Sequence, residues 1–365
     1  MAAEPDGAPG GAADPHPPSC GRPLALEQQA VDLSDEMRFV WHRPPMDVVE
    51  RQWQDPTVVR IFLNGCFDLM HVGHFNALRQ AKHLFYQKGF REVILVAGLH
   101  SDVAIAGQKG PPLMTDDERV EVLRATKWVD EMATGLPYAP MSAEMADALR
   151  VNWICHGDDL PVCKTGDGMY SDAMERGRFQ LLKRTEGIST TQILERLLQQ
   201  SPADGAGPCA AAGAAANAGL QSALVTTQRL AHFAAPADPA LGARSIGDAR
   251  RVVYVGGAFD LLHGGHVCFL QQAAKLGDYL VVGLHSDDLL HQHRGARPIL
   301  TLPERSLMVL AVRGVDDVVL GAPWVASQEL LTTMNVAVVA TSQRGRKRPL
   351  DGGADAGGSA PGAGG

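Results

Sequence analysis

Apolar runs and segments of helical composition alternate along the chain. Residues 58–62, 93–99 and 151–155 are dominated by apolar side chains, which predicts buried strands. Residues 75–82 follow the first run and have the composition of a helix. Strands that alternate with helices predict an α/β fold with an open parallel sheet. No Gly-x-Gly-x-x-Gly follows a strand, which argues against a dinucleotide site of that type.

The first strand leads into a turn that the chain repeats once. Residues 65–74 contain Gly, Phe-Asp-Leu and His-x-Gly-His, and residues 257–266 contain the same elements in register. Further on, Arg119 matches Arg305. Packing alone would preserve the leucines, but it has no reason to preserve both histidines and the aspartate. A duplicated fold is the simplest explanation.

The repeat and the composition around it divide the chain into five segments. The first stretch is rich in Ala, Gly, Pro and Asp and is expected to be disordered, with helical fragments after residue 25. The predicted segments are a mostly disordered region 1–57, a first domain 58–200, an Ala/Gly linker 201–250 with a short helix near 224–233, a second domain 251–343 and a disordered tail 344–365.

The second copy departs from the first near its end. Its last strand, residues 336–340, is followed by residues 341–344, which differ from the matching residues 156–159 of the first copy. No segment of the second copy corresponds in sequence to residues 184–191. The second domain is therefore expected to lack the last part of its sheet and half of its site.

Composition narrows the class of protein. The 365 residues are enough for two domains, and a formal net charge of -8 argues against a generic nucleic-acid binder. No apolar run is long enough for a membrane span, and the N-terminus does not have the pattern of a secretory signal. Six scattered cysteines without C-x-x-C spacing argue against a zinc cluster or a disulfide framework. We expect a cytoplasmic location.

Two histidines fall on the first turn of a helix at the repeated turn. At this place backbone N–H groups lack partners and the helix dipole is positive, so His71 and His74 are well placed to meet phosphate. Gly73 between them lets an anion approach the backbone. The alternative is that both histidines only cap the helix, and the repetition of the pattern disfavours it.

These residues resemble the cytidylyltransferase family of nucleotidyltransferases, whose signature is His-x-Gly-His after a Gly-x-Phe-Asp turn. Residues 184–191 match the family's second motif, Arg-Thr-x-Gly-Ile-Ser-Thr-Thr. The resemblance covers roughly residues 58–200 and 222–340, and the tandem arrangement is similar to the members that use phosphoethanolamine. It implies two tandem Rossmann-like nucleotidyltransferase domains with parallel sheets, the second incomplete at its C-terminal end.

The resemblance also implies roles for individual residues. The catalytic positions are His71, His74, Lys109 and Arg184. The nucleotide-binding positions are Gly65, Cys66, Phe67, Asp68, Gly73, His156, Gly157, Asp158, Asp159, Thr185, Gly187, Ile188, Ser189, Thr190 and Thr191. Asp102 and Arg119 are candidate substrate contacts, and Ala258, Phe259, Asp260, His263 and His266 form a second nucleotide site, which the loss of its surroundings would make vestigial.

Three of these assignments leave alternatives open. Asp68 could orient a histidine, could meet a substrate ammonium, or could simply stabilise the turn. Asp158 and Asp159 could contact the nucleotide or the substrate amine, or could cap a turn. Lys109 could reach the β- and γ-phosphates from its Gly/Pro loop, or could be solvated surface.

The resemblance implies transfer of CMP from CTP to phosphoethanolamine, which gives CDP-ethanolamine and pyrophosphate for phosphatidylethanolamine synthesis. Mg²⁺ is expected to arrive with CTP, and no metal is expected to be held by the protein alone. The alternatives are the same reaction on phosphocholine or glycerol 3-phosphate, or a catalytically inactive nucleotide-binding relic. No amphipathic lipid-sensing helix follows the domains, which favours ethanolamine over choline.

The resemblance and the composition also lead to expectations about binding partners and location. Besides CTP and phosphoethanolamine we expect no nucleic acid, no membrane span, and a cytoplasmic protein with peripheral attachment to the endoplasmic reticulum as a variant. The repeat alone suggests that the two halves pack as an intramolecular pseudo-dimer. The basic run at residues 344–348 reads either as a nuclear-import or polyanion patch or as a solvated end.

Overall fold

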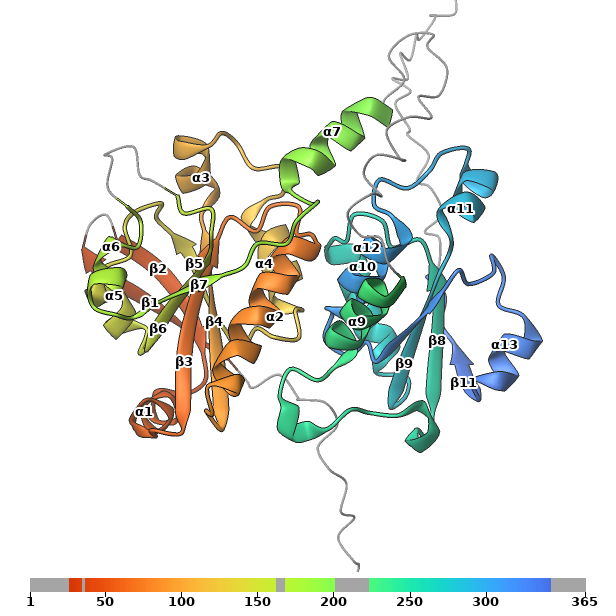
Figure 1. Ribbon diagram of the computed structural model, residues 1–365, viewed down its shortest axis with the longest axis horizontal. Coiled ribbons are helices and arrows are strands. Elements are labelled where there is room, and N and C mark those ends of the chain that lie inside the picture. Colours follow the sequence, from red (N-terminus) through yellow and green to blue (C-terminus); the bar gives the residue numbers. More distant parts are fainter. Residues whose placement is uncertain (1–25, 35–36, 162–167, 201–222, 343–365) are drawn as a thin grey trace, which may run out of the picture.

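A computed structural model describes residues 26–34, 37–161, 168–200 and 223–342. Figure 1 shows two sheets side by side, with helices packed between them and on their outer faces. The predictions of disorder for residues 1–25 and of the linker for residues 201–222 lie outside the described residues, as do those for the tail and its basic run. None of the described helices is long and apolar enough to cross a membrane.

The larger sheet has seven strands in the order β1-β2-β5-β4-β3-β6-β7. Its strands are β1 (Glu27–Ser34), β2 (Met37–Arg43), β3 (Val58–Gly65), β4 (Glu92–His100), β5 (Glu131–Leu136), β6 (Trp153–Gly157) and β7 (Phe179–Leu182). The five strands from β3 to β7 run parallel, as predicted, and β3 and β4 are almost fully buried. The hairpin of β1 and β2 adds two antiparallel strands at one edge.

Seven helices accompany this sheet. They are α1 (Met46–Gln54), α2 (Val72–Gln87), α3 (Asp102–Gln108), α4 (Asp116–Arg124), α5 (Ala143–Ala148), α6 (Ser171–Glu175) and α7 (Thr190–Gln200). Helix α2 buries Phe75, Leu78 and Phe85 against the sheet, at the i, i+3 and i+10 positions of one face. This helix follows β3 directly, so the predicted strand, turn and helix are confirmed.

The second half repeats this arrangement in a smaller sheet with the order β10-β9-β8-β11, all parallel. Its elements are α9 (Ala223–Ala234), the 3-10 turns Pro239–Leu241 and Ile246–Asp248, β8 (Val252–Gly257), α10 (Gly264–Ala274), β9 (Tyr279–Leu284), α11 (Asp287–Arg294), α12 (Leu302–Leu310), β10 (Asp317–Leu320), α13 (Gln328–Thr333) and β11 (Val336–Val339). Strand β11 corresponds to β6, and the described residues contain no counterpart of β7 beyond it. Helix α9 is the helix predicted near residues 224–233.

The prediction that residues 1–57 are mostly disordered is wrong for residues 27–34 and 37–54. These residues form β1, β2 and α1, and they belong to the first sheet. Trp41 on β2 is 1% exposed, and its Nε1 donates to Glu131 Oε2 at 3.0 Å. Glu131 also pairs with Arg60, and both side chains are buried. The hairpin is therefore held by a buried charge network as well as by apolar packing.

The two halves share one apolar core. Helices α2 and α4 of the first half contact α10 and α12 of the second half. At the centre of this contact Thr126 and Val312 form an antiparallel bridge, flanked by hydrogen bonds from Lys127 N to Ala311 O and from Arg313 N to Ala125 O. One continuous cluster of buried side chains includes Phe75 and Leu123 from the first half and Val267 and Val309 from the second.

Candidate active site

The turn between β3 and α2 presents the two signature histidines. His71 is the N-cap of α2, and its Nδ1 accepts a hydrogen bond from Gly73 N at 3.0 Å. The Nδ1 of His74 accepts from His71 N at 3.3 Å, and the two ring centroids are 4.1 Å apart. Because both Nδ1 atoms are acceptors, each neutral ring carries its proton on Nε2. The backbone thus fixes two Nε2–H donors beside each other at a helix N-terminus.

Both imidazoles are neutral at pH 7. Burial lowers the pKa of His71 to about 2, helped by the neighbouring His74 and Arg184. Burial also lowers the pKa of His74 to about 4, where the nearby Asp159 opposes the shift and Lys109 adds to it. In this state the rings act as hydrogen-bond donors, while positive charge in the site comes from Lys109 and Arg184.

The turn itself is strained, and Asp68 holds its shape. Phe67 and Leu69 have φ values of 50° and 44°, a left-handed conformation that is uncommon for such residues. Between them, the Asp68 carboxylate accepts hydrogen bonds from Leu113 N at 2.8 Å and Met114 N at 3.0 Å. These bonds support the stabilising role of Asp68, and they fix the start of α4 as well as the turn. The other two roles of Asp68 stay predictions.

Asp102 and Arg119 have a different role from the one predicted. Arg119 is fully buried, and its guanidinium donates to Cys66 O and to Asp102 Oδ1, each at 2.6 Å. It also donates to His100 O at 3.0 Å. Neither Asp102 nor Arg119 lines the cavity described below. The prediction that they contact substrate is therefore corrected: they form an ion pair that anchors the backbone behind the turn.

The second motif lies against the first. Thr185 accepts a hydrogen bond from Asn76 Nδ2 of α2 at 2.9 Å. Gly187 then takes a φ of 81°, which only glycine adopts easily, and the chain turns into α7. At the start of α7, Thr190 Oγ1 donates to Asp68 O at 3.4 Å. The N-termini of α2 and α7 consequently face one space, and the first backbone N–H groups of a helix have no partner within the helix.

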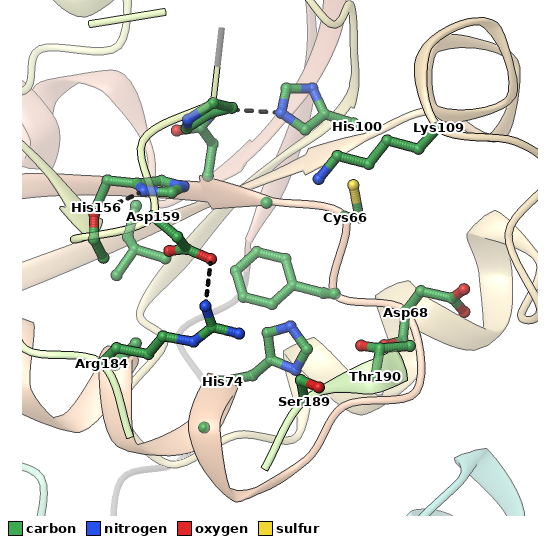
Figure 2. A pocket seen from close by; sticks show the side chains of 18 of the residues that line it. Cys66, Asp68, His74, His100, Lys109, His156, Asp159, Arg184, Ser189 and Thr190 are labelled. Carbon is green, nitrogen blue, oxygen red and sulfur yellow. Dashed lines mark hydrogen bonds and ion pairs between the residues drawn. The ribbon is translucent and has the colours of Figure 1, made fainter. Parts of the chain in front are cut away.

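A cavity of about 540 Å³ opens at the carboxyl ends of β3, β4 and β6. Figure 2 shows Lys109, His74 and Arg184 directed into this cavity from different elements. Arg184 Nη1 lies 3.6 Å from Asp159 Oδ2, and both side chains are half-exposed. The predicted residues that line the cavity are Gly65, Cys66, Phe67, Asp68, His71, Gly73, His74, Lys109, His156, Gly157, Asp159, Arg184, Thr185, Ile188, Ser189, Thr190 and Thr191. Asp158 and Gly187 are not part of the lining.

Several lining residues were not predicted, among them Asn64, His100, Tyr138 and Tyr170. Asn64 Nδ2 lies 3.1 Å from His100 Nε2, and Tyr170 donates its hydroxyl to Asn64 Oδ1 at 3.0 Å. The rings of His100 and Tyr138 pack together, with centroids 4.9 Å apart. His100 stands at the end of a predicted strand, a position that could have revealed it. Tyr170 comes from a part of the chain without any sequence signal.

The second copy has the same turn, but its described part lacks some of the elements that surround the turn in the first copy. His263 caps α10 and accepts from Gly265 N at 3.1 Å, and its ring centroid is 4.0 Å from that of His266. Phe259 has a φ of 49°, as Phe67 does. Within the described part of the second half, however, no strand and helix stand where β7 and α7 stand in the first. Nucleotide binding at Ala258, Phe259, Asp260, His263 and His266 stays a prediction.

The buried histidines predict how stability depends on pH. The pKa of His74 is about 4 in the folded protein and near 6.5 when unfolded. Its contribution is complete above pH 6.5 and is lost as the pH falls toward 4, because only the unfolded chain then takes up the proton. We expect the melting temperature of His74→Gln to fall less steeply than that of wild type between pH 7 and pH 5, measured by circular dichroism. Parallel curves would contradict this.

The sequence of this chain is similar to those of known proteins. Residues 62–196 and 254–345 match the profile of the family described as cytidylyltransferase-like. The chain is 39% identical over 295 residues to the ethanolamine-phosphate cytidylyltransferase of Dictyostelium discoideum, covering 77% of this chain and 78% of the relative. The protein of that name from Arabidopsis thaliana is 39% identical, covering 77% and 69%. The one from Mus musculus is 35% identical, covering 78% and 76%.

Proposed function

The chain belongs to the cytidylyltransferase-like family, and from this premise we propose that it transfers CMP from CTP to phosphoethanolamine, giving CDP-ethanolamine and pyrophosphate. One observation carries the proposal: His71, His74, Lys109 and Arg184 line a single cavity at the ends of parallel strands. The choice of phosphoethanolamine rests on the names of the relatives, which match the chain over both halves.

The reaction needs no protein nucleophile, but it does need positive charge that stabilises two anionic reactants close together. An oxygen of phosphoethanolamine attacks the α-phosphorus of CTP, the bond from that phosphorus to the bridging oxygen breaks, and pyrophosphate leaves. Both reactants are anions, so bringing them together is costly without nearby cations. Lys109 and Arg184 supply these charges from opposite sides of the cavity. The N-termini of α2 and α7 add oriented backbone dipoles.

The histidine pair acts on the developing charge. Their Nε2–H groups are fixed by the backbone bonds to Nδ1, so no reorganisation is needed as negative charge gathers on the departing pyrophosphate. Because the rings are neutral in the free protein, they stabilise by donating hydrogen bonds rather than by ion pairing. They need not give up a proton, since pyrophosphate leaves as an anion.

We propose that Mg²⁺ binds to the site together with CTP. The lining has two carboxylates, and Asp68 uses both of its oxygens for backbone N–H groups. Asp159 is left as the acidic side chain available to an ion from the protein side. This donor set fits a hydrated ion held mainly by nucleotide phosphates, whose role would be to neutralise phosphate charge.

The cavity also suits a small ammonium group. The rings of Tyr138 and Tyr170 and the carboxylate of Asp159 all line the cavity, where Tyr138 packs on His100 and Tyr170 packs on His156. Aromatic faces and a carboxylate attract a cation, and a primary ammonium can in addition donate hydrogen bonds. Glycerol 3-phosphate has no such charge, which makes it the weaker alternative. Phosphocholine shares the charge and differs in its lack of N–H donors.

The test is a comparison of three substrates. Pyrophosphate release is measured with CTP and phosphoethanolamine, phosphocholine or glycerol 3-phosphate at equal concentrations. We expect the highest kcat/KM with phosphoethanolamine. A higher value with phosphocholine would overturn the substrate, and the absence of turnover with all three would favour the inactive nucleotide-binding relic.

We further propose that the two halves pack as an intramolecular pseudo-dimer. The support is the reciprocity of their contact. Lys127 N donates to Ala311 O, and Arg313 N donates to Ala125 O, so matching residues of the two copies exchange matching bonds. The bridge between Thr126 and Val312 joins equivalent positions in the same way. Such reciprocity is the property of an isologous interface between subunits.

A further inference from the structure

Helix α7 connects the cavity of the first half to the second half. Its first residues, Thr190 and Thr191, line the cavity, and the helix then extends to the side of the second half, as Figure 1 shows. Near its end the guanidinium of Arg196 contacts Glu304 of α12, with Nη1 at 2.9 Å from Oε2 and 3.1 Å from Oε1. The two side chains are 19% and 3% exposed. This ion pair is therefore shielded from water and from salt.

Glu304 is itself fixed in place. Its Oε2 accepts from Thr301 N at 2.8 Å and from Thr301 Oγ1 at 3.0 Å, which makes it part of the N-terminal cap of α12. Arg196 also reaches Ile299 O at 3.4 Å. The guanidinium thus meets one carboxylate and one carbonyl whose positions are set by the second half alone.

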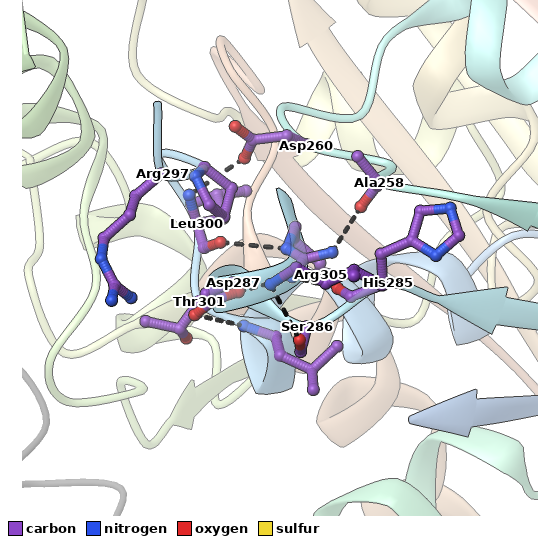
Figure 3. A network of polar contacts seen from close by, with 12 residues as sticks. Ala258, Asp260, His285, Ser286, Asp287, Arg297, Leu300, Thr301 and Arg305 are labelled. Atoms are coloured by element: carbon purple, nitrogen blue, oxygen red, sulfur yellow. Dashed lines mark hydrogen bonds and ion pairs between the residues drawn. The ribbon is translucent and has the colours of Figure 1, made fainter. Parts of the chain in front are cut away.

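Residues of the repeated turn in the second copy fix the segment that Arg196 contacts. Asp260 accepts from Ile299 N at 2.7 Å and from Leu300 N at 3.0 Å. Arg305 is fully buried and donates to Ala258 O at 2.6 Å and to Leu300 O at 3.1 Å. Figure 3 shows this network, in which each member fixes the segment just before α12. The repeated turn of the second copy therefore shapes the place where α7 docks.

The contact also reaches the loop that precedes α7. A small cavity is lined by Thr185, Gly187 and Ile188 from the second motif together with Glu304 and Leu307 from α12. The loop of residues 185–188 thus lines the same small cavity as α12. Movement of α12 relative to the first sheet would be transmitted to both ends of this loop.

We propose that the second half positions α7, with Arg196 and Glu304 as the positioning residues, so that Ser189, Thr190 and Thr191 are held ready for the triphosphate of CTP. The inference rests on the proposed function for the identity of that anion. It assigns the second half a task in the reaction at the first site, through a helix that the second half lacks in its described part. The loss of half of its own site is compatible with this task.

An ordinary interface contact would behave differently from a positioning pair. Arg313 provides the comparison, because its guanidinium crosses between the halves to Thr126 O and Val129 O and lies outside the cavity lining. A variant of Arg313 weakens the interface without touching α7. A variant of Arg196 weakens the hold on α7 itself.

The experiment compares Arg196→Gln, Arg196→Lys and Arg313→Gln in the full chain. We expect Arg196→Gln to raise KM for CTP about tenfold, within the range typical of coupling between sites, with KM for phosphoethanolamine nearly unchanged. Arg196→Lys keeps the charge and should recover most of the affinity. Arg313→Gln should lower the melting temperature and leave KM for CTP at the wild-type value.

Hydrogen exchange provides a readout that does not need turnover. Amides of residues 188–193 should exchange faster in Arg196→Gln than in wild type, and those of Arg313→Gln should match wild type. Unchanged exchange and unchanged KM for CTP in Arg196→Gln would overturn the inference. Equal effects of Arg196→Gln and Arg313→Gln on both measurements would also overturn it, since that pattern indicates general destabilisation. Because exchange is measured without substrates, failure of the proposed reaction would leave this test intact.

Discussion

Replacing His71 by alanine is expected to lower kcat by roughly 10²–10³-fold, the effect of removing one preorganised donor from a developing oxyanion. The imidazole Nε2–H is fixed by the bond that Nδ1 accepts from Gly73 N, so its loss removes a donor that the transition state uses more than the ground state does. KM for CTP should change much less than kcat. Steady-state release of pyrophosphate measures both.

Two variants separate this chemistry from helix capping. His71→Ala also removes the N-cap of α2, whose loss typically costs about 0.5–2 kcal/mol of stability. His71→Asn keeps a side chain that caps well and removes the imidazole, so we expect it to be nearly as inactive as alanine and more stable. His263→Ala removes the matching cap in the second copy and should cost far less activity. Wild-type kcat in His71→Asn would exclude the imidazole from the reaction.

Arg184→Ala is expected to lower kcat/KM for CTP by roughly 10²–10³-fold. Arg184 is a cation in the cavity lining, at the edge where the second motif begins, and it lies 3.6 Å from the Asp159 carboxylate. A phosphate that enters the site offers the guanidinium a more highly charged partner with matching geometry. Lysine at this position keeps the positive charge but lacks the bidentate geometry of the guanidinium. Arg184→Lys should therefore have only part of the wild-type activity.

The control for Arg184 is another arginine of the same half. Arg176 pairs with Asp172 on the surface and is not part of the lining, so Arg176→Ala should be as active as wild type. Rates are compared at two salt concentrations, because the contribution of a half-exposed cation is screened by salt. If Arg184→Ala and Arg176→Ala have the same kcat/KM, Arg184 has no part in binding the triphosphate.

Local sequence patterns predicted the strands, turns and helices whose formation depends on residues close together in the chain. The run before Gly65 and the helix after His74 became β3 and α2, and the repeat of that turn near Phe259 became β8 and α10. Thr115 and Glu118 form a capping box, a motif that their spacing of three residues encodes. These features depend on neighbours within a few residues, so the sequence reveals them without knowledge of the tertiary contacts.

The N-terminal hairpin was missed for a reason that is also physical. Phe39 and Trp41 are buried on β2, but the strand has only seven residues, and the apolar Val40 between them breaks the alternation that would reveal a strand. What stabilises the strand is remote: Trp41 meets Glu131, which pairs with Arg60. A buried charge network assembled from three distant segments leaves no trace in the local composition.

The same limit applies to the site. Carboxylates and arginines at the ends of strands look alike in sequence, whether they touch a ligand or anchor the backbone. Arg119 and Asp102 were assigned to the substrate for this reason, and the geometry shows them behind the turn. Tyr170 was overlooked because its partner Asn64 is 106 residues away along the chain. The cytoplasmic location, with attachment to the endoplasmic reticulum as its variant, stays a prediction.

Three of the four outer strands of the two sheets are short, and this affects how each sheet meets other proteins. The seven-stranded sheet ends in β1, with eight residues, at one edge and in β7, with four residues, at the other. In the described part of the smaller sheet, β10 and β11 stand at the edges with four residues each. Strands this short present few unpaired amides, so they offer a poor template for intermolecular β-pairing and aggregation.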